Sequence, residues 1–458
     1  MTAITVRYSV NGTLFRKACI CTAGIVLAVC TSVCAQQTAE TVTLRYAIHW
    51  TDLHQLEGIS ADGVKTTRGV LDYLREYERI RPHIKIEHMI IPYVQYPSKL
   101  KLFHEVGKVP DIYQIYASWG VSFVQQGIFD PAPADLVADI QSHFLTTAGV
   151  TINGSIWGIP TEINDYALLC NKKIFRESGL VDDEGNIKYP RTWEELLDAA
   201  ARTTKLDADG KMVQCGFAFF KGMDFGVVDP FLSLLFTNNG RFLSEDNKTF
   251  LANSPEGVQT LEAMKALFKI GAADLSFNMW DFGKETVAMV IAAPWTESHF
   301  RGAFRKKLDN IDFNDRVGVV PIPYLKKRAN LQYSWFMGVM AQSPHKKEAW
   351  DFLRWFAGEI QPETGRTRYG ALLADTIGAI PARTSDIKRS PGLNNPFKKV
   401  YVDQLANSVP EPSVAEYSRI KNILRIYIES ALAGEISSQK ALGRAAVEIN
   451  EILHMHYR

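Results

Sequence analysis

From residue 44 onward, apolar positions follow in turn the period of a strand and the period of a helix. Apolar residues on both sides of Arg45 predict a strand over 44–50, and residues 64–77 place apolar side chains at helical spacing. Pro82 ends this helix, and isoleucines spaced along 84–91 predict a second strand. A strand, a helix and a strand in this order indicate the parallel sheet of an α/β protein.

The alternation continues along the chain, and several predicted helices start at capping residues. Residues 110–115 predict a strand, and residues 121–127 predict a helix that Gly127 closes. Thr192, with Glu195 three residues later, has the pattern of a capping box. Because no Pro-rich linker or repeat interrupts the sequence, we expect sheet crossovers rather than a tether between lobes. Three further helix starts carry serine, at Ser254, Ser343 and Ser437.

Length and composition indicate how many hydrophobic cores the chain forms and which class of protein it belongs to. A chain of 458 residues exceeds the size of one ordinary core, so two large lobes are expected. With 46% apolar and 22% charged residues, the composition is that of a globular protein. The formal net charge of +1 lacks the basic excess that phosphate binding requires, so we expect no nucleic-acid partner.

The first 35 residues have the pattern of a secretory signal. Three basic residues precede an uncharged stretch over 18–35, and small residues stand at its end. We predict cleavage after Ala35. A lipoprotein at Cys30 is the less favoured alternative, because Val29 stands where a small residue is required. The stretch is too short and too polar for a membrane anchor, so we predict a periplasmic or secreted protein.

Two cysteines, Cys170 and Cys215, lie beyond the predicted signal. A scaffold held together by disulfides is thereby excluded. One disulfide is compatible with an oxidising compartment, but a chain of this size does not need it, and the sequence favours two free thiols.

A series of short motifs follows in order from residue 157 onward. Residues 157–160 are Trp-Gly-Ile-Pro, residues 168–175 are Leu-Leu-Cys-Asn-Lys-Lys-Ile-Phe, and residues 190–196 are Pro-Arg-Thr-Trp-Glu-Glu-Leu. Further segments lie at 288–295, 318–323, 347–356 and 378–383. Together they resemble the extracellular solute-binding proteins of ABC importers, the group that includes maltose-binding and other sugar-binding proteins. Cys170 departs from the family pattern, which has tyrosine there. No single motif is specific, and their order carries the resemblance.

The resemblance implies an α/β protein with the two-lobed periplasmic-binding-protein fold, a hinge and a ligand cleft between the lobes. The chain is expected to cross between lobes near 159–165, 321–324 and 377–381. After a signal over 1–35, we therefore expect one lobe to comprise residues 36–162 and 322–378. The other lobe is expected to comprise residues 163–321 and 379–458.

Candidate ligand-binding residues stand at the ends of predicted strands, where open sheets present binding groups. Sugar recognition needs flat apolar faces beside planar hydrogen-bonding groups. The candidate stacking residues are Trp50, Trp119, Trp295 and Trp335, and their polar or aromatic neighbours in sequence are Asp52, Tyr116 and Glu297. For each, the alternative is a partly buried loop residue. Trp119 and Trp295 are favoured, because the matching family segments supply stacking residues.

The predicted crossover adds two carboxylates, and the resemblance adds one aromatic residue. Glu162 and Asp165 lie on a segment that is expected to line both lobes, with a hinge-bonding role as the alternative. Tyr417 lies in a stretch that in sugar-binding relatives offers an aromatic ring to the cleft. Arg383 is expected to pair with a neighbouring carboxylate, and Trp193, Trp350 and Trp355 are expected in the core.

The sequence lacks the motifs of serine hydrolases, zinc proteases and nucleotide-binding proteins. Its acidic turns at 182–186 and 207–210 lack EF-hand spacing, so no metal site, cofactor or catalytic residue is predicted. We predict a monomeric carbohydrate-binding component of an ABC importer, which delivers a sugar or oligosaccharide to the transmembrane subunits of a permease. The alternatives are a secreted glycoside hydrolase that uses Glu162 and Glu297, and a binding protein that presents its ligand to a membrane sensor.

Overall fold

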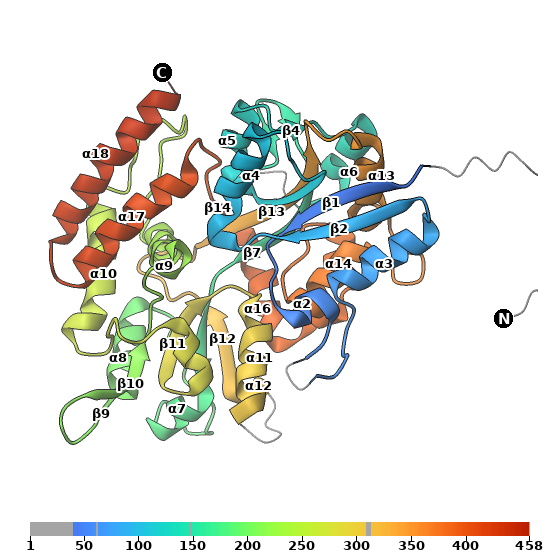
Figure 1. Cartoon of the computed structure of the whole chain (residues 1–458). Coiled ribbons are helices and arrows are strands. Elements are labelled where there is room, and N and C mark those ends of the chain that lie inside the picture. Colours follow the sequence, from blue (N-terminus) through green and yellow to red (C-terminus); the bar gives the residue numbers. More distant parts are fainter. Residues whose placement is uncertain (1–39, 61–62, 146–148, 308–312, 458) are drawn as a thin grey trace, which may run out of the picture. The chain divides into compact units, whose positions relative to one another are not determined.

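The computed structural model describes residues 40–60, 63–145, 149–307 and 313–457. The predicted signal, its cleavage site and Cys30 lie outside these residues. Val42–Arg458 forms one compact unit, and its mixed α/β architecture contains two main sheets, as the sequence predicts (Figure 1). Among the described helices, none combines the length and apolar character needed to cross a membrane.

The first sheet is organised around one long strand, β13 (Asn330–Met340). The strand order is β14-β13-β3-β1-β2, and β4 and β7 also pair with β13. β1 runs parallel to β2 and β3, as the opening strand–helix–strand pattern predicts, whereas β13 runs antiparallel to β3, β4 and β7. The other strands are β1 (Val42–Ile48), β2 (Ile84–Ile90), β3 (Ile112–Tyr116), β4 (Phe129–Asp130), β7 (Ile159–Asp165) and β14 (Ser408–Pro410).

The second sheet has the order β12-β8-β11-β10-β9. Its central strands are fully buried, which explains their continuous apolar runs. β10 and β11 run parallel, and β8 runs antiparallel to β11 and β12. The strands are β8 (Ala167–Asn171), β9 (Lys205–Leu206), β10 (Met212–Phe217), β11 (Val287–Ala292) and β12 (Val317–Pro321), and β5 (Thr151–Ile152) with β6 (Ser155–Ile156) forms a separate pair.

Three segments connect the two sheets. Tyr166 alone separates β7, in the first sheet, from β8, in the second. The chain returns between β12 and β13, and a third segment runs beside β7, where the backbone N–H of Ile163 donates to the carbonyl of Ile380. β14 then pairs in the first sheet, although residue 408 lies in the range predicted for the other lobe. The assignment of residue ranges to lobes stays a prediction.

Three of the four predicted caps are present, whereas the prediction was wrong for Ser343, because the next helix, α13, begins at Lys346 with His345 as its N-cap. The Thr192 side chain accepts from the Glu195 N–H in a full capping box, and Ser254 and Ser437 also cap their helices. The helix predicted over 64–77 begins only at Val70, so the prediction was wrong for 64–69. There Ile59 and Lys65 form an isolated antiparallel bridge, which holds the backbone extended.

The helices surround both sheets, and α17 packs against α18, α9 and α10 (Figure 1). Cys170 and Cys215 are free and buried. Trp193, Trp350 and Trp355 lie in the core, as predicted. The α-helices are α2 (Leu53–Glu57), α3 (Val70–Ile80), α4 (Tyr96–Glu105), α5 (Gly120–Gln125), α6 (Ala134–His143), α7 (Lys172–Glu177), α8 (Trp193–Thr203), α9 (Asp224–Thr237), α10 (Pro255–Lys269), α11 (Thr296–Lys307), α12 (Phe313–Arg316), α13 (Lys346–Leu353), α14 (Arg368–Leu372), α15 (Thr384–Arg389), α16 (Pro396–Gln404), α17 (Tyr417–Leu432) and α18 (Ser438–His456). Short 3₁₀ or π turns are η1 (Tyr93–Gln95), η2 (Ala117–Trp119), η3 (Met279–Lys284), η4 (Arg354–Gly358), η5 (Leu373–Ile377), η6 (Pro391–Asn394) and η7 (Leu405–Asn407).

Candidate functional site

A cavity of about 380 Å³ lies where strands of both sheets end. The first sheet contributes residues that follow β1 and β2 and the last residue of β3, and the second sheet contributes residues that follow β10 and β11. Its volume is within the roughly 300–1,000 Å³ of small-molecule sites. We call this space the aromatic cavity, and it is lined by His49, Trp50, Thr51, Gln55, Tyr93, Tyr116, Glu162, Tyr166, Phe220, Met223, Phe225, Asp229, Met279, Trp280, Ile291, Ala292, Ala293, Trp295, Tyr333, Trp335 and Ile377.

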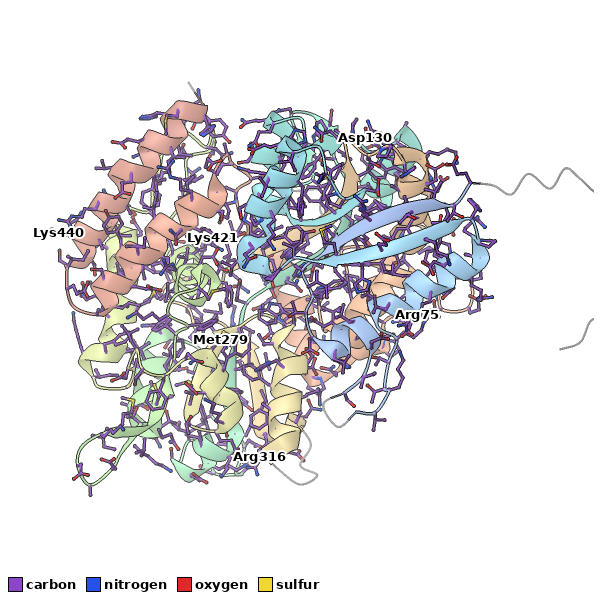
Figure 2. All side chains as sticks on the ribbon, viewed as in Figure 1. Arg75, Asp130, Met279, Arg316, Lys421 and Lys440 are labelled. Carbon is purple, nitrogen blue, oxygen red and sulfur yellow. The ribbon has the colours of Figure 1, made fainter. Side chains whose placement is uncertain are left out.

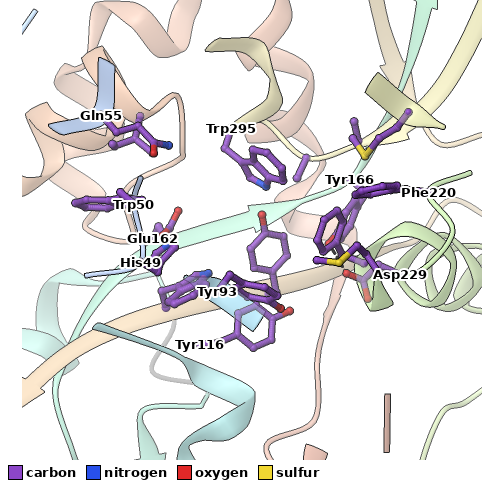
Figure 3. Close-up of a pocket in the computed structure, with 18 of the residues that line it drawn as sticks. His49, Trp50, Gln55, Tyr93, Tyr116, Glu162, Tyr166, Phe220, Asp229 and Trp295 are labelled. Carbon is purple, nitrogen blue, oxygen red and sulfur yellow. Dashed lines mark hydrogen bonds between the residues drawn. The ribbon is translucent and has the colours of Figure 1, made fainter. Parts of the chain in front are cut away.

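Aromatic rings form most of the wall. In Figure 3, Trp295 lies on one side of the cavity, and Tyr93 and Tyr116 lie on the opposite side. Trp335 is buried and stacks on His49 at 4.1 Å between ring centroids. Because these rings pack against other rings, their orientations are fixed before any ligand enters. Trp295 is only partly buried, so its ring keeps a free surface.

Glu162 is a carboxylate at the centre of the crossover strand β7. Its side chain is buried and lines the aromatic cavity (Figure 3). The Asn164 side-chain amide donates to the Oε2 atom of Glu162 at 2.9 Å. The Oδ1 atom of Asn164 in turn accepts from the Ile380 N–H. Burial raises the pKa of Glu162 to about 7, against the opposing effect of the Asn164 hydrogen bond. Glu162 is therefore oriented by two of the segments that connect the sheets.

A second buried carboxylate, Asp229 on α9, lines the far end of the cavity. Lys421 on α17 (Figure 2) lies 2.5 Å from Asp229, 3.1 Å from Glu411 and 3.6 Å from Asp224. The Tyr166 hydroxyl donates to Asp229. Burial raises the pKa of Asp229 to about 7, although Lys421 acts in the opposite direction. Lys421 therefore forms ion pairs with three carboxylates beside the cavity.

Asp52 and Glu297, both predicted from sequence, lie in a different groove of about 960 Å³. There Glu297 forms ion pairs with Arg301 at 2.7 Å and with Lys398 at 3.0 Å. Burial acts to raise the pKa of Glu297, but Lys398 and Arg301 outweigh it, so the pKa is lowered. The structure thus places Glu162 and Glu297 in separate cavities rather than across one glycosidic bond.

The remaining predicted residues are divided between the cavity and its surroundings. Trp50, Tyr116, Trp295 and Trp335 line the aromatic cavity with Glu162. Trp119 packs behind Tyr93, at 5.3 Å between ring centroids, and lines a smaller neighbouring pocket. Asp165 is fully buried outside the cavity lining, and Tyr417 packs in the core against Phe242.

Arg383 pairs with Asp139 at 2.6 Å, which confirms the predicted role in an ion pair. Among the described residues, no group of three or more His, Cys, Asp or Glu side chains is arranged to hold a metal ion.

Sequence reasoning missed several cavity residues. Tyr333 could have been found, because it stands two residues before Trp335 on β13 and strand side chains at this spacing share a face. Tyr93 and Trp280 lie in 3₁₀ turns, which carry no comparable pattern. Asp229 and Lys421 come together only through the packing of α9 against α17.

Comparison with known proteins gives one consistent result. The family model of the bacterial extracellular solute-binding protein matches residues 61–361. A binding protein of Brucella abortus is 21% identical over 392 residues, which cover 83% of this chain and 88% of that protein.

Two solved structures resemble the fold closely. An ABC transporter solute-binding protein of Thermotoga lettingae, bound with α-D-tagatose, has a TM-score of 0.74 at 22% identity and covers 90% of this chain and 100% of its own. The GacH receptor of Streptomyces glaucescens, solved unliganded and with acarbose, has a TM-score of 0.74 at 20% identity. The match covers 90% of this chain and 99% of the receptor chain.

Proposed function

The chain belongs to the bacterial extracellular solute-binding protein family, and we propose that it captures a carbohydrate in the aromatic cavity and delivers it to an ABC permease. Membership of this family places the chain in the periplasm or outside the cell, and the family's proteins bind solutes. The aromatic cavity is the observation that carries the proposal. It combines facing aromatic rings with two buried carboxylates, Glu162 on β7 and Asp229 on α9.

The chemistry of the wall suits a sugar ring. Pyranose rings present C–H faces that pack on aromatic surfaces, and their hydroxyls need planar hydrogen-bonding groups. Trp295 and Trp50 would supply such surfaces, and Gln55 and Glu162 would bind hydroxyls. The tagatose and acarbose complexes of the two structural neighbours support a carbohydrate ligand for this chain.

In the proposed cycle, the two lobes close about the crossover at Tyr166, and the permease recognises the closed form. Ligand shifts this equilibrium only by binding the closed form more tightly. We propose the lobe ranges and the cleavage after Ala35 given above, a monomeric protein, and no chemical turnover of the bound sugar.

The test is a thermal-shift screen of residues 36–458 against sugars, oligosaccharides, polyols and polyamines, followed by calorimetry. A carbohydrate at a hundred times its Kd should stabilise the protein by roughly 2.7 kcal/mol. The carbohydrate should be recovered chemically unchanged after incubation. Binding only to a non-carbohydrate would refute the proposed ligand class, and cleavage of the carbohydrate would support the hydrolase alternative.

A further inference from the structure

The residues that line the aromatic cavity include acidic side chains but no strongly basic ones. Neither lysine nor arginine lines it among the described residues, while two carboxylates, Glu162 and Asp229, do. His49 adds no positive charge, because burial lowers its pKa to about 3. The wall groups that can gain a charge near neutral pH are therefore acidic.

Glu162 is the more informative of the two carboxylates. Within the described part of the chain, Asn164 is its one side-chain donor, and no cation contributes to its electrostatic surroundings. The side chain is only 5% exposed. A buried carboxylate costs several kcal/mol unless a positive charge or further hydrogen bonds compensate it. The compensating group has room to enter from the cavity.

Lys421 does not supply that charge to the cavity. Its ammonium group is held by Asp229, Glu411 and Asp224, so one positive charge faces three acidic groups. Glu411 also accepts hydrogen bonds from the Tyr116 and Ser118 hydroxyls. This end of the cavity therefore has an excess of acidic groups as well.

The aromatic faces favour the same sign of charge. The face of an aromatic ring is electron-rich and attracts cations, most strongly when water is excluded. Ten of the cavity-lining residues are Trp, Tyr or Phe. A neutral sugar would gain stacking and hydrogen bonds but no ion pair, and an acidic sugar would be repelled by both carboxylates and rings.

We propose that the solute carries a protonated amine, as in an amino sugar or an oligosaccharide with a free amino group, and that Glu162 pairs with this amine. The proposal rests on the carbohydrate-binding function proposed above and specifies its ligand class. The amine would lie against the aromatic rings while the sugar ring stacks on them. Specificity would come from an ion pair between the amine and Glu162, which has no cation of the protein beside it among the described residues.

The test compares matched probes by calorimetry: glucosamine, N-acetylglucosamine and glucose, and their β-1,4-linked disaccharides. Within each set, the probes differ only in the group at C2. We expect the amine-bearing probe to bind at least about tenfold more tightly than either neutral probe. Equal or tighter binding of a neutral probe overturns the inference and leaves the proposed function standing. If no amine-bearing probe binds, the inference is wrong, and if no carbohydrate of the wider screen binds, the proposed function fails as well.

Two variants locate the effect. Glu162→Gln keeps an acceptor for Asn164 but removes the charge, so the preference for the amine over the neutral probes should fall to about twofold or less. Glu285→Gln removes a charge from another buried glutamate, which pairs with Lys173 and Arg316 away from the cavity, and it should keep the full preference. Persistence of the preference in Glu162→Gln would show that this carboxylate does not hold the amine.

Discussion

Two buried glutamates near the cleft have opposite electrostatic surroundings. Glu162 and Glu297 are 5% and 6% exposed, and both were predicted as ligand-binding residues. Glu162 faces the aromatic cavity with one amide donor, and burial raises its pKa to about 7. Glu297 sits between Lys398 and Arg301, which hold its pKa below the ordinary value despite burial.

The difference shows that neighbouring cations, rather than the degree of burial, determine the pKa and the role of a buried carboxylate. Glu297 has its compensating charges within the protein, and Lys398 also donates to the carbonyls of Pro294 and Gly378. This arrangement ties α11, α16 and a connecting segment together. Glu162 has no such cation among the described residues, so its charge is available to a solute. We interpret Glu297 as a structural residue and Glu162 as a ligand-binding residue.

Removing the cation of the structural pair should have the largest effect. Lys398→Met leaves Glu297 buried beside only the partly exposed Arg301, and the free energy of unfolding should fall by about 3–5 kcal/mol. Urea unfolding followed by circular dichroism measures it. Lys399→Met, next in sequence and paired with Asp403 at the surface, is the matched control and should change little. Equal losses in the two variants would contradict the structural role.

Neutralising the two glutamates should change stability in opposite directions. The pKa of Glu162 is raised from 4.5 to about 7 in the folded state, so its burial costs stability that grows as pH rises from 4.5 to 7. Glu162→Gln should therefore stabilise the protein by about 3 kcal/mol at pH 8 and hardly at all at pH 4.

Glu297→Gln should instead destabilise the protein at pH 8. Because the pKa of Glu297 is lowered, its contribution is present above the ordinary pKa and is lost as the pH falls. Urea unfolding of both variants at several pH values checks the signs. The same sign for both variants would remove the contrast between the two sites.

Trp295 tests the boundary between the two sites, because it lines the aromatic cavity while Glu297, two residues later, does not. Trp295→Ala should weaken binding of the identified solute by about 2 kcal/mol, or roughly thirtyfold in Kd. Stability should change little, since the ring is partly exposed. Trp157→Phe, outside the cavity, serves as the control for a changed tryptophan. Unchanged affinity in Trp295→Ala would remove this residue from the site.

The smallest effect is expected from Arg301. Its side chain is 34% exposed, and Lys398 remains beside Glu297 when it is removed. Arg301→Gln should cost about 0.5–1 kcal/mol, and less in about 1 M salt, which screens exposed charges. A loss as large as that of Lys398→Met would show that both cations are needed to hold Glu297.

Local signals in the sequence predicted much of the fold. The capping box at Thr192 and the parallel pairing of the first strands depend on neighbouring residues and on strand–helix alternation, and the structure confirms both. The helix start at Val70 was missed, because the bridge between Ile59 and Lys65 competes with a sequence of helical period. Tertiary contacts decided that boundary.

The site was only partly accessible to such reasoning. Trp50, Trp295 and Glu162 were found because they stand after apolar strands or on the crossover. Whether a carboxylate has a partner cannot be inferred from its neighbours in sequence. The cation beside Glu297 comes from α16, and the three acids around Lys421 come from α9 and from the segment after β14.

The connectivity of the first sheet also sets an order of assembly. β13 is the neighbour of β3, β4, β7 and β14, yet it spans Asn330–Met340, late in the chain. A chain that emerges from the ribosome N-terminus first therefore lacks the central strand of its first sheet until residue 340 has been made. Such long-range pairing slows folding. Because the family is extracellular, we expect the late central strand to favour export, since it leaves the first sheet incomplete while the chain is being made.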